Sequence, residues 1–319
     1  MVDFDITILG CGSAKPTLRH YTSSQVVKRS GTLYMIDCGE GAQRQFQRYG
    51  FHEGQLENIF ISHAHGDHCL GLIGFLSSLS LNGRNRNMNL YLPAELVPIL
   101  QAQIDFFIPH AAFGILLHPI DSQKPIRILS DEHFDITALP LQHRIPCYGF
   151  LFEEKPGNRH IIADCIKQYN IPRSQIKHIQ QGGDFTTADG QVIPNACLTT
   201  PPTPTRSYAY LSDTRPIMEY AELLHGVDLL YHDSTYAGAD QKLAVQYDHS
   251  TSLEAAMFAE KCQAGQLLLG HYSSRYHNDL YILEDAIRLF PHTMLTDEGM
   301  IVPILDKTAQ GPLISSWKR

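Results

Sequence analysis

The chain has 319 residues, of which 43% are hydrophobic and 18% charged, and its formal net charge is −8. This balance is that of an ordinary globular protein and excludes a largely disordered chain. It also means that a nucleic-acid binder would need a local basic patch, because the overall field of the chain repels phosphate.

The seven cysteines are odd in number and widely spaced, and no CxxC pair occurs among them. Such usage is typical of reduced thiols in the cytosol and argues against a disulfide framework. The opening residues MVDFDITILG have no basic region before an apolar core, so they do not resemble a signal peptide. The chain has no run of about 18 apolar residues, which is the length needed to span a membrane. We therefore expect a cytoplasmic protein without a membrane segment.

In chain order, short β-rich runs alternate with loops that carry histidine or aspartate, and helical patterns often follow. Strands are expected within 4–10, 32–37, 58–62, 89–93, 134–143, 208–213, 227–233, 266–271 and 299–305. Helices are expected at 69–82, 94–107, 252–263 and 284–290. Side chains on loops at strand ends are held by a rigid scaffold, which is where function usually lies.

One segment, at about 153–206, breaks this pattern with turn-rich and proline-rich sequence. Between Lys155 and His178 it has five basic residues and one acidic residue, a net charge of +4 within a chain of −8. We interpret it as an inserted basic arm and not as a second domain. The expected organisation is a single domain over 1–306 that contains this arm, followed by a C-terminal tail at 307–319.

The most informative stretch is IFISHAHGDHCLG at 59–71, which places His63, His65, Asp67 and His68 directly after an apolar run. Imidazole and carboxylate are natural ligands of zinc and similar ions. A random match to H-x-H-x-D-H in so histidine-rich a chain is on the order of one in several hundred. The alternative is a histidine-rich surface loop without a metal. The motif favours a metal site.

One such loop cannot complete two metal sites, so further ligands must come from other strand ends. His143, Asp213 and His271 each end an apolar β-like run. Singly, each could be an ordinary loop residue; together they complete a set of seven. In this set one ion would be held by His63, His65 and His143, the other by Asp67, His68 and His271, and Asp213 would bridge them.

With these residues in place, the chain resembles the ribonuclease Z (tRNA 3′-endonuclease) family of the metallo-β-lactamase superfamily. The motif SHAHGDHCLGL is typical of the superfamily, and the segments LGCGSAKPT, MIDCGEGAQRQ, LQHRIPCYGF, YLSDTRP, YDHSTSLEAA and GHYSSRY follow the family's pattern. The resemblance runs from about residue 4 to about residue 302. It implies an α+β fold, a four-layer αββα metallo-β-lactamase sandwich with an inserted basic arm.

The resemblance also implies an activity. The family removes the 3′ trailer of precursor tRNA by two-metal hydroxide attack on phosphorus, leaving a 3′-OH on the tRNA and a 5′-phosphate on the trailer. Two Zn²⁺ per subunit are expected, with Mn²⁺ or another divalent ion as an alternative. In this family the arm of one subunit serves the site of its partner, which implies a homodimer.

Site roles follow from the same resemblance. Asp67 would be the general base, and His249 in DHST would be the proton donor or the stabiliser of the transition state. From its position four residues after His271, Arg275 could pair with a phosphate, and a surface ion pair is the alternative. Ser13, Lys15 and Thr17 in the Gly-rich first loop could meet RNA near the cut, and a simple tight turn is the alternative there.

The chain departs from the family's usual motifs at three places. Leu211-Ser212-Asp213-Thr214 stands where Ser-Gly-Asp-Thr is usual, which leaves the bridging aspartate in place. His232-Asp233-Ser234-Thr235 replaces His-Glu-Ala-Thr, so a supporting role for Asp233 rests on a shorter carboxylate. The arm lacks the expected Gly-Pro turn, which leaves its mode of binding RNA open.

Two other classes of function compete with the tRNA nuclease. The same metal core supports hydrolysis of a small phosphodiester, thioester or lactone, since a fold does not determine a function. Such an enzyme would not need a basic insertion of about fifty residues. A non-catalytic RNA-binding scaffold is the third possibility, but buried ligands without a metal would be costly unpaired polar groups.

Overall fold

The structure is a computed structural model that describes residues 3–305 and 316–317. The chain divides into two compact units: residues 1–153 with 206–319 form unit 1, and Glu154–Thr205 form unit 2. The tail expected at 307–319 lies outside the described residues except for Ser316–Trp317, which form a short strand. The units are described separately below.

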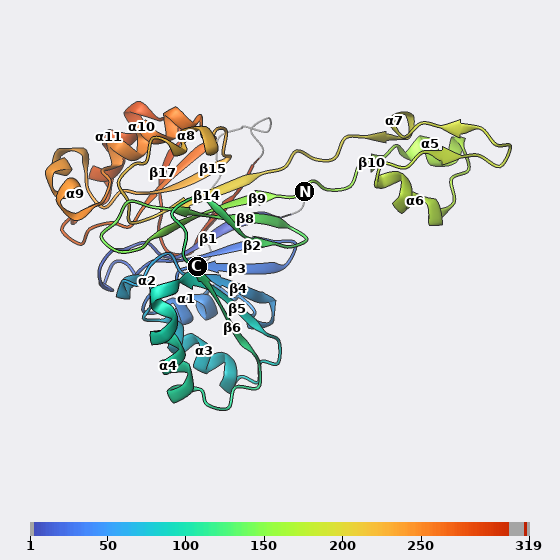
Figure 1. The fold of residues 1–319 in the computed structure, drawn as a ribbon. Coiled ribbons are helices and arrows are strands. Elements are labelled where there is room, and N and C mark those ends of the chain that lie inside the picture. Colours follow the sequence, from blue (N-terminus) through green and yellow to red (C-terminus); the bar gives the residue numbers. More distant parts are fainter. Residues whose placement is uncertain (1–2, 306–315, 318–319) are drawn as a thin grey trace. The chain divides into compact units, whose positions relative to one another are not determined.

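Unit 1 is built on two large sheets (Figure 1). The first has the strand order β19-β18-β1-β2-β3-β4-β5-β6, and the second has the order β17-β16-β15-β14-β9-β8-β7. The strands of the first sheet are β1 (Phe4–Gly10), β2 (Ser24–Arg29), β3 (Thr32–Ile36), β4 (Leu56–Phe60), β5 (Met88–Pro93), β6 (Ile115–Ile120), β18 (Met300–Pro303) and β19 (Ser316–Trp317). Those of the second are β7 (Ile126–Ser130), β8 (Phe134–Pro140), β9 (Tyr148–Glu154), β14 (Ser207–Leu211), β15 (Leu229–Asp233), β16 (Gln266–Gly270) and β17 (Thr293–Leu295).

Helices cover the outer face of each sheet (Figure 1). Beside the first sheet lie α1 (Ala42–Arg48), α2 (Gly66–Cys69), α3 (Leu72–Leu81) and α4 (Val97–Phe107). Beside the second lie α8 (Tyr220–Leu223), α9 (Gln241–Tyr247), α10 (Ser252–Cys262) and α11 (Leu280–Leu289). Short 3₁₀ turns occupy Glu53–Gln55, Ala94–Leu96 and Gly238–Asp240.

The two sheets pack face to face through a largely aromatic core. Phe60 on β4 contacts Phe150 and Phe152 on β9, with ring centroids 5.4 and 5.6 Å apart. A separate core joins the first sheet to its helices, where the rings of Phe46 on α1 and Phe75 on α3 lie 5.3 Å apart. The layers therefore run helix, sheet, sheet, helix, which is the four-layer αββα sandwich expected from the sequence.

Parallel pairing places the functional loops at common sheet edges. β3, β4, β5 and β6 pair in parallel in one sheet, and β14, β15, β16 and β17 do so in the other. Every residue of β15 and β16 is buried, as expected of parallel strands covered on both faces. Because parallel strands end at the same edge, the loops that follow them come together.

The predicted helix over 69–82 is interrupted, and the reason is local packing. α2 ends at Cys69 and α3 begins at Leu72, with Gly71 between them. A Cβ at Gly71 would lie 2.1 Å from the carbonyl oxygen of Gly39, so only glycine allows this approach to the loop after β3. The prediction also missed β2, β6, β7 and β9 and the short helices α1, α8 and α9.

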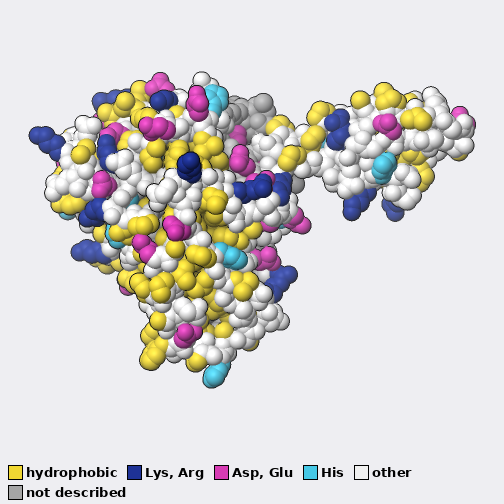
Figure 2. Space-filling model, in the orientation of Figure 1, with side chains coloured by type: hydrophobic (Ala, Val, Ile, Leu, Met, Phe, Trp, Pro, Cys, Tyr) yellow, Lys and Arg dark blue, Asp and Glu magenta, His cyan; other side chains and the backbone are white. Residues whose placement is uncertain are grey.

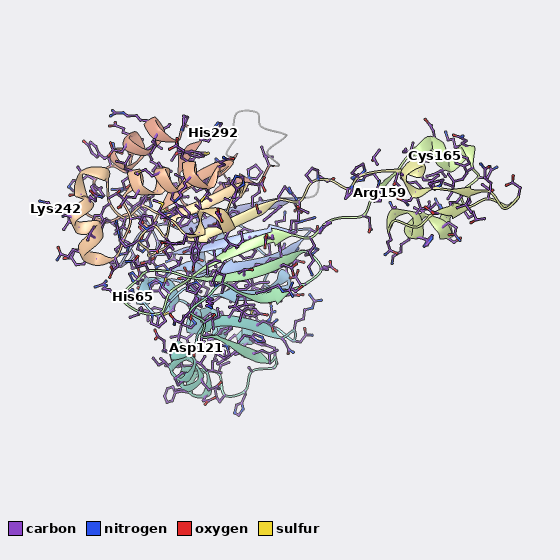
Figure 3. All side chains as sticks on the ribbon, turned by 45° about the horizontal axis from the view of Figure 1, so that its top comes forward. His65, Asp121, Arg159, Cys165, Lys242 and His292 are labelled. Atoms are coloured by element: carbon purple, nitrogen blue, oxygen red, sulfur yellow. The ribbon has the colours of Figure 1, made fainter. Side chains whose placement is uncertain are left out.

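Unit 2 is a small folded body with its own core. It contains β10 (His160–Ile161), β11 (Phe185–Thr186), β12 (Val192–Ile193), β13 (Thr199–Thr200), α5 (Ala163–Gln168), α6 (Arg173–Gln180) and α7 (Asn195–Leu198). Its buried residues include Cys165, Ile179 and Leu198; Figure 3 labels Cys165 within this unit and Arg159 near its first strand. This self-contained core shows that the inserted segment is a folded unit.

Candidate metal centre

The histidine motif occupies the turn from β4 into α2. After Phe60, Ser62 and His63 are fully buried, and His68 is fully buried on α2. The backbone of this turn is fixed from both sides, because Tyr148 N–H donates to Ser62 O and Cys38 N–H donates to His68 O. The rigid turn directs four polar side chains into one space at the edge of the sandwich, where Figure 3 labels His65.

Three histidine nitrogens and one carboxylate oxygen converge in the first part of this space. His63 Nε2 lies 3.0 Å from His65 Nδ1, and His143 Nε2 lies 3.3 Å from the same His65 atom. Asp213 Oδ1 lies 3.7 Å from His63 Nε2. These four residues form one group whose ligand atoms all lie within 4.8 Å of one another.

A second convergence lies directly beside the first. His271 Nε2 is 3.4 Å from both Asp67 Oδ2 and His68 Nε2. Asp213 Oδ2 lies 3.0 Å from His68 Nε2 and 3.3 Å from His271 Nε2. Asp213 therefore presents one carboxylate oxygen to each group, and all seven residues singled out from the sequence meet at one place.

The donor set fits divalent metal ions. Ligand atoms around a tetrahedral ion with bonds near 2.0–2.1 Å lie about 3.3 Å apart, close to the separations seen here. Burial, together with the neighbouring His68, holds the pKa of His63 well below its usual value, so its imidazole is neutral and its lone pair can bind a metal. Asp213 and His271 both have positive φ, 56° and 63°, a conformation that non-glycine residues keep where the surroundings enforce it.

Asp37 supports His68 from behind, and the sequence analysis did not identify it. Its Oδ2 accepts hydrogen bonds from His68 Nδ1 at 2.7 Å, from Ser62 Oγ at 2.9 Å and from Tyr210 Oη at 2.7 Å. A carboxylate on one ring nitrogen turns the other toward the metal and makes it more basic. The available signal was the aspartate that directly follows the strand at 32–36, ahead of Gly39.

Two other partners orient ligands in the same way. Thr235 Oγ1 lies 2.8 Å from His271 Nδ1 and donates to Asp233 Oδ1 at 2.7 Å. His143 Nδ1 donates to the backbone oxygen of Asp248 at 3.3 Å. In His271 and His143, Nδ1 is therefore hydrogen-bonded to another residue of the protein, and Nε2 is directed toward the metal centre.

His249 lies against this centre and forms a pair with Asp233. Its Nδ1 is 2.8 Å from Asp233 Oδ2, and the rings of His249 and His271 are stacked with centroids 5.3 Å apart. Burial lowers the pKa of His249, but the charge and hydrogen bond of Asp233 outweigh burial and raise it to about 9. The shorter aspartate therefore still reaches the histidine.

Asp67 is held by the first loop of the chain. Ala14 N–H donates to Asp67 Oδ2 at 2.6 Å, and Ala14 itself has a φ of 64°. Burial alone would raise the pKa of Asp67, but His68 and the hydrogen bond from His271 hold it well below its usual range. The carboxylate is therefore ionised at neutral pH, as both a metal ligand and a base require.

The residues predicted to meet substrate lie around this first loop, at a short distance from the ligands. Ser13 and Thr17 line a cavity of about 270 Å³ beside Tyr272, while Lys15 is exposed. The Ser13 hydroxyl donates to Tyr272 O at 3.0 Å, and Thr17 Oγ1 accepts from His20 N–H at 2.9 Å. Both hydroxyls are thus used within the protein.

Arg275 is directed toward neighbouring side chains of unit 1. Its guanidinium lies 3.5 Å from Asp240 Oδ1 and 5.8 Å from the centroid of the Tyr236 ring. The Arg275 side chain is 43% exposed, so its ion pair with Asp240 contributes little to stability. Arg275 could therefore exchange Asp240 for a phosphate.

A separate buried cluster fixes the first loop to the rest of unit 1. His20 lies between two carboxylates, with Nε2 3.0 Å from Asp279 Oδ2 and Nδ1 3.1 Å from Glu298 Oε2. Burial opposes protonation, but the hydrogen bonds of Asp279, Cys11 and Glu298 outweigh it and raise the pKa of His20 to about 12. The charged His20 ring therefore links the first loop to the segments that carry Asp279 and Glu298.

We expect His20→Gln to lower the free energy of unfolding by about 2 kcal/mol at neutral pH, because Glu298 loses its cation while Asp279 keeps its pair with Arg19. Since the folded-state pKa is raised, this contribution is complete below the unfolded pKa of about 6.5 and fades as pH rises toward the folded value. Urea unfolding of both proteins at pH 6 and pH 10 measures it. A difference that grows with pH would contradict the assignment of charge.

A cluster of histidine and aspartate ligands for divalent metal, at the edge of a four-layer αββα sandwich, defines a metal-dependent hydrolase of metallo-β-lactamase fold. Solved structures share this fold. The short form of human tRNase Z matches with a TM-score of 0.69 and 24% identity, covering 95% of this chain and all of that one. A metallo-β-lactamase fold protein from Bacillus subtilis matches with a TM-score of 0.68 and 18% identity, covering 95% of this chain and all of that one.

Curated relatives are similar over nearly the whole chain. A ribonuclease Z from Bacteroides thetaiotaomicron is 42% identical over 97% of this chain and 98% of its own. One from Porphyromonas gingivalis strain W83 is 43% identical over 95% of this chain and all of its own. Residues 4–107 also match the family described as Anti-Pycsar protein Apyc1. The chain belongs to the ribonuclease Z family.

Proposed function

We propose that this protein is a zinc-dependent endoribonuclease that removes the 3′ trailer of precursor tRNA. The cut leaves a 3′-OH on the tRNA and a 5′-phosphate on the trailer. The observation that carries the proposal is the convergence of seven ligand residues in a chain of this family, because a two-metal centre suits in-line displacement at a phosphodiester.

Two zinc ions per subunit fit the two groups of ligands. One ion would be held by His63, His65 and His143, the other by Asp67, His68 and His271, with Asp213 between them. When bound, such a pair of ions supplies positive charge that lowers the pKa of a water molecule and stabilises the charged phosphate. Manganese would bind the same oxygen and nitrogen ligands.

The chain's own residues supply the proton transfers. Asp67 accepts a proton from the attacking water, and the hydrogen bond from Ala14 N–H fixes its carboxylate. His249 donates a proton to the departing O3′, which is a poor leaving group. Asp233 holds the imidazole by its Nδ1 and stabilises its charged form, so that Nε2 remains free to donate.

We expect His249→Ala to slow precursor-tRNA cleavage by about 10²–10⁴-fold, the usual effect of removing a positioned proton donor. Hydrolysis of bis(p-nitrophenyl) phosphate should change little, because p-nitrophenolate leaves without a proton. Single-turnover rates on both substrates measure the effect. Equal loss on the two substrates would show that His249 does not act on the leaving group.

Unit 2 is proposed to grip the body of the tRNA. Lys167 on α5 and Arg173 and Lys177 on α6 are exposed, so the basic residues of this unit lie mainly on its two longer helices. Contacts of this kind to phosphate weaken as salt rises.

We also propose a cytoplasmic location, which the seven free cysteines support. Across residues 3–305 and 316–317, none of the helices has the length and apolar character needed to cross a membrane.

A homodimer is proposed as the working form. Ile99, Phe106 and Phe107 on α4 are 57%, 77% and 60% exposed, and Leu70, just after the metal-binding motif, is 62% exposed. Figure 2 shows apolar side chains gathered over the part of unit 1 that α4 occupies in Figure 1. An apolar surface of this kind is typical of a protein interface, and a second copy of this chain would cover it.

If the arm of one subunit serves the site of its partner, two defective subunits should complement each other. We expect the triple variant Lys167→Gln, Arg173→Gln, Lys177→Gln and the variant Asp67→Ala each to cleave precursor tRNA poorly. Their mixture should recover up to about a quarter of wild-type activity, since half of random dimers are mixed and each has one complete site. No recovery in mixtures shown to exchange subunits would contradict service in trans.

The function itself is tested by cleavage of a precursor tRNA with a 3′ trailer, in zinc or manganese, with both product ends mapped. A cut just after the discriminator base that leaves a 3′-OH is expected. Absence of cleavage by the fully metallated protein, with rapid hydrolysis of a small phosphodiester or thioester, would overturn the proposal and favour a small-substrate hydrolase.

A further inference from the structure

The loop that carries His249 is tied to the metal centre by backbone contacts. Asp248 has a positive φ of 57°, which turns the chain sharply before His249. His143 Nδ1 donates to Asp248 O at 3.3 Å, and Ser250 Oγ donates to Thr214 O at 2.5 Å. Between these contacts, Arg215 Nη1 donates to the carbonyl oxygen of His249 at 2.6 Å.

Arg215 is itself held by a paired carboxylate. Its Nη1 also lies 2.9 Å from Glu254 Oε2, and its Nη2 pairs with Glu254 Oε1. Glu254 completes the capping box of α10, where Thr251 N–H donates to Glu254 Oε2 at 2.9 Å and Glu254 N–H donates to Thr251 Oγ1 at 3.2 Å. The two side chains are only 16% and 12% exposed, so the geometry is well fixed.

The backbone of Arg215 connects this clamp to the bridging ligand. Arg215 lies two residues after Asp213, and its N–H donates to Gln142 O at 3.2 Å, next to His143. Thr214 N–H between them donates to Asp233 Oδ2 at 3.0 Å, and the same oxygen accepts from His249 Nδ1. The ring of His249 and its carbonyl group are therefore both located relative to the segment that carries Asp213.

We propose that Arg215 is a positioning residue that places the His249 imidazole at the departing O3′ by holding its backbone carbonyl against the N-terminus of α10. This inference rests on the proposed role of His249. The planar guanidinium suits the task because one nitrogen reaches both the carbonyl and the carboxylate while the second completes the pair. A lysine ammonium has three donors but no planar fork, so it cannot form the bidentate pair with Glu254 that fixes the position of the arginine.

Loss of the clamp should displace the proton donor more than the candidate metal ligands. His68 and His271 keep their hydrogen bonds to Asp37 and Thr235, and only His143 contacts the loop itself, through Asp248 O. A displacement of about 1 Å in a reacting group can cost about 10²-fold in rate. The effect should fall on substrates whose leaving group needs a proton and spare those whose leaving group does not. A purely structural role would affect both alike.

The test compares wild type with Arg215→Gln and Arg215→Lys, using precursor tRNA and bis(p-nitrophenyl) phosphate on fully metallated protein. Arg215→Gln is expected to slow the single-turnover cleavage of tRNA by about 10–100-fold and to leave hydrolysis of the activated ester within about twofold. Arg215→Lys should fall between wild type and Arg215→Gln on tRNA. The matched control is Arg84→Gln. Arg84 is also a buried arginine that donates to backbone carbonyls, but it lies outside the centre, and its acceptors are Glu53, Leu56, Arg86 and Asn87. Arg84→Gln should leave the ratio of the two rates unchanged.

Equal slowing of both substrates by Arg215→Gln, or no slowing of either, would overturn the inference. His249→Ala is measured in parallel and separates this failure from that of the proposed function. If His249→Ala is selective for tRNA and Arg215→Gln is not, only the role of Arg215 fails. If His249→Ala also slows both substrates equally, the proton-donor role fails with it.

Discussion

Replacing Asp67 by alanine should reduce precursor-tRNA cleavage by about 10⁴-fold or more, at or beyond the upper end for removal of an acid–base group. Two tasks are proposed for the carboxylate. Its Oδ2 lies 3.4 Å from His271 Nε2 in the second ligand group, and it accepts the Ala14 N–H at 2.6 Å. Alanine would therefore remove a proposed metal ligand and the proposed base together.

Single-turnover cleavage at saturating enzyme is the appropriate measurement, because it reports the chemical step and not tRNA binding. Asp121→Ala is the control, an exposed aspartate of unit 1 labelled in Figure 3, and it should match wild type. Binding of uncleaved precursor by Asp67→Ala should be preserved. Cleavage by Asp67→Ala within tenfold of wild type would exclude both the base and the ligand role.

Replacing Asp213, the proposed bridging carboxylate, should reduce both metal content and cleavage. Asp213 presents Oδ1 to His63 and Oδ2 to His68 and His271, and its side chain is almost wholly buried. We expect Asp213→Ala to bind one ion or fewer per chain where wild type binds about two, and to lose cleavage by about 10⁴-fold, as for loss of a two-metal centre. Elemental analysis of dialysed protein measures the content directly.

Chelation of the wild-type protein supplies the matching experiment without a mutation. A ligand present at about 100 times its Kd adds about 2.7 kcal/mol to stability, so removing the ions should lower Tm and abolish cleavage. Zinc or manganese should restore both in wild type, whereas in Asp213→Ala it should not restore cleavage and should restore Tm at most in part. Retention of full activity after complete chelation would contradict a metal-dependent mechanism.

The seven candidate ligands, which the structure brings together, could be found in the sequence because most of their signal is local. His63, His65, Asp67 and His68 lie in one turn, and each of the other three ends a β-rich run. The layered fold followed from the resemblance and from strands alternating with helices, and the comparisons confirm it. Short elements such as β2 and α9 were missed because their residues do not complete a readable period.

The supporting residues could not be found in this way, because their partners are distant in the chain. Asp37 meets His68 and Tyr210 only when β3, β4 and β14 pack in one sandwich. Arg215 reaches the carbonyl of His249 34 residues away, and no local pattern announces that contact. Asp233 could be suspected from its motif, but whether its shorter side chain reached His249 was decided by packing.

The sequence by itself therefore determined the chemistry: which residue types gather, in what order, and that they suit metal ions and phosphodiester hydrolysis. Only the tertiary structure decided which nitrogen of each imidazole faces the centre, that Asp213 presents one oxygen to each ligand group, and which side chains hold His249 and Asp67. The physical reason is that ligand identity is a property of single residues, whereas orientation depends on hydrogen bonds between segments that meet only after folding.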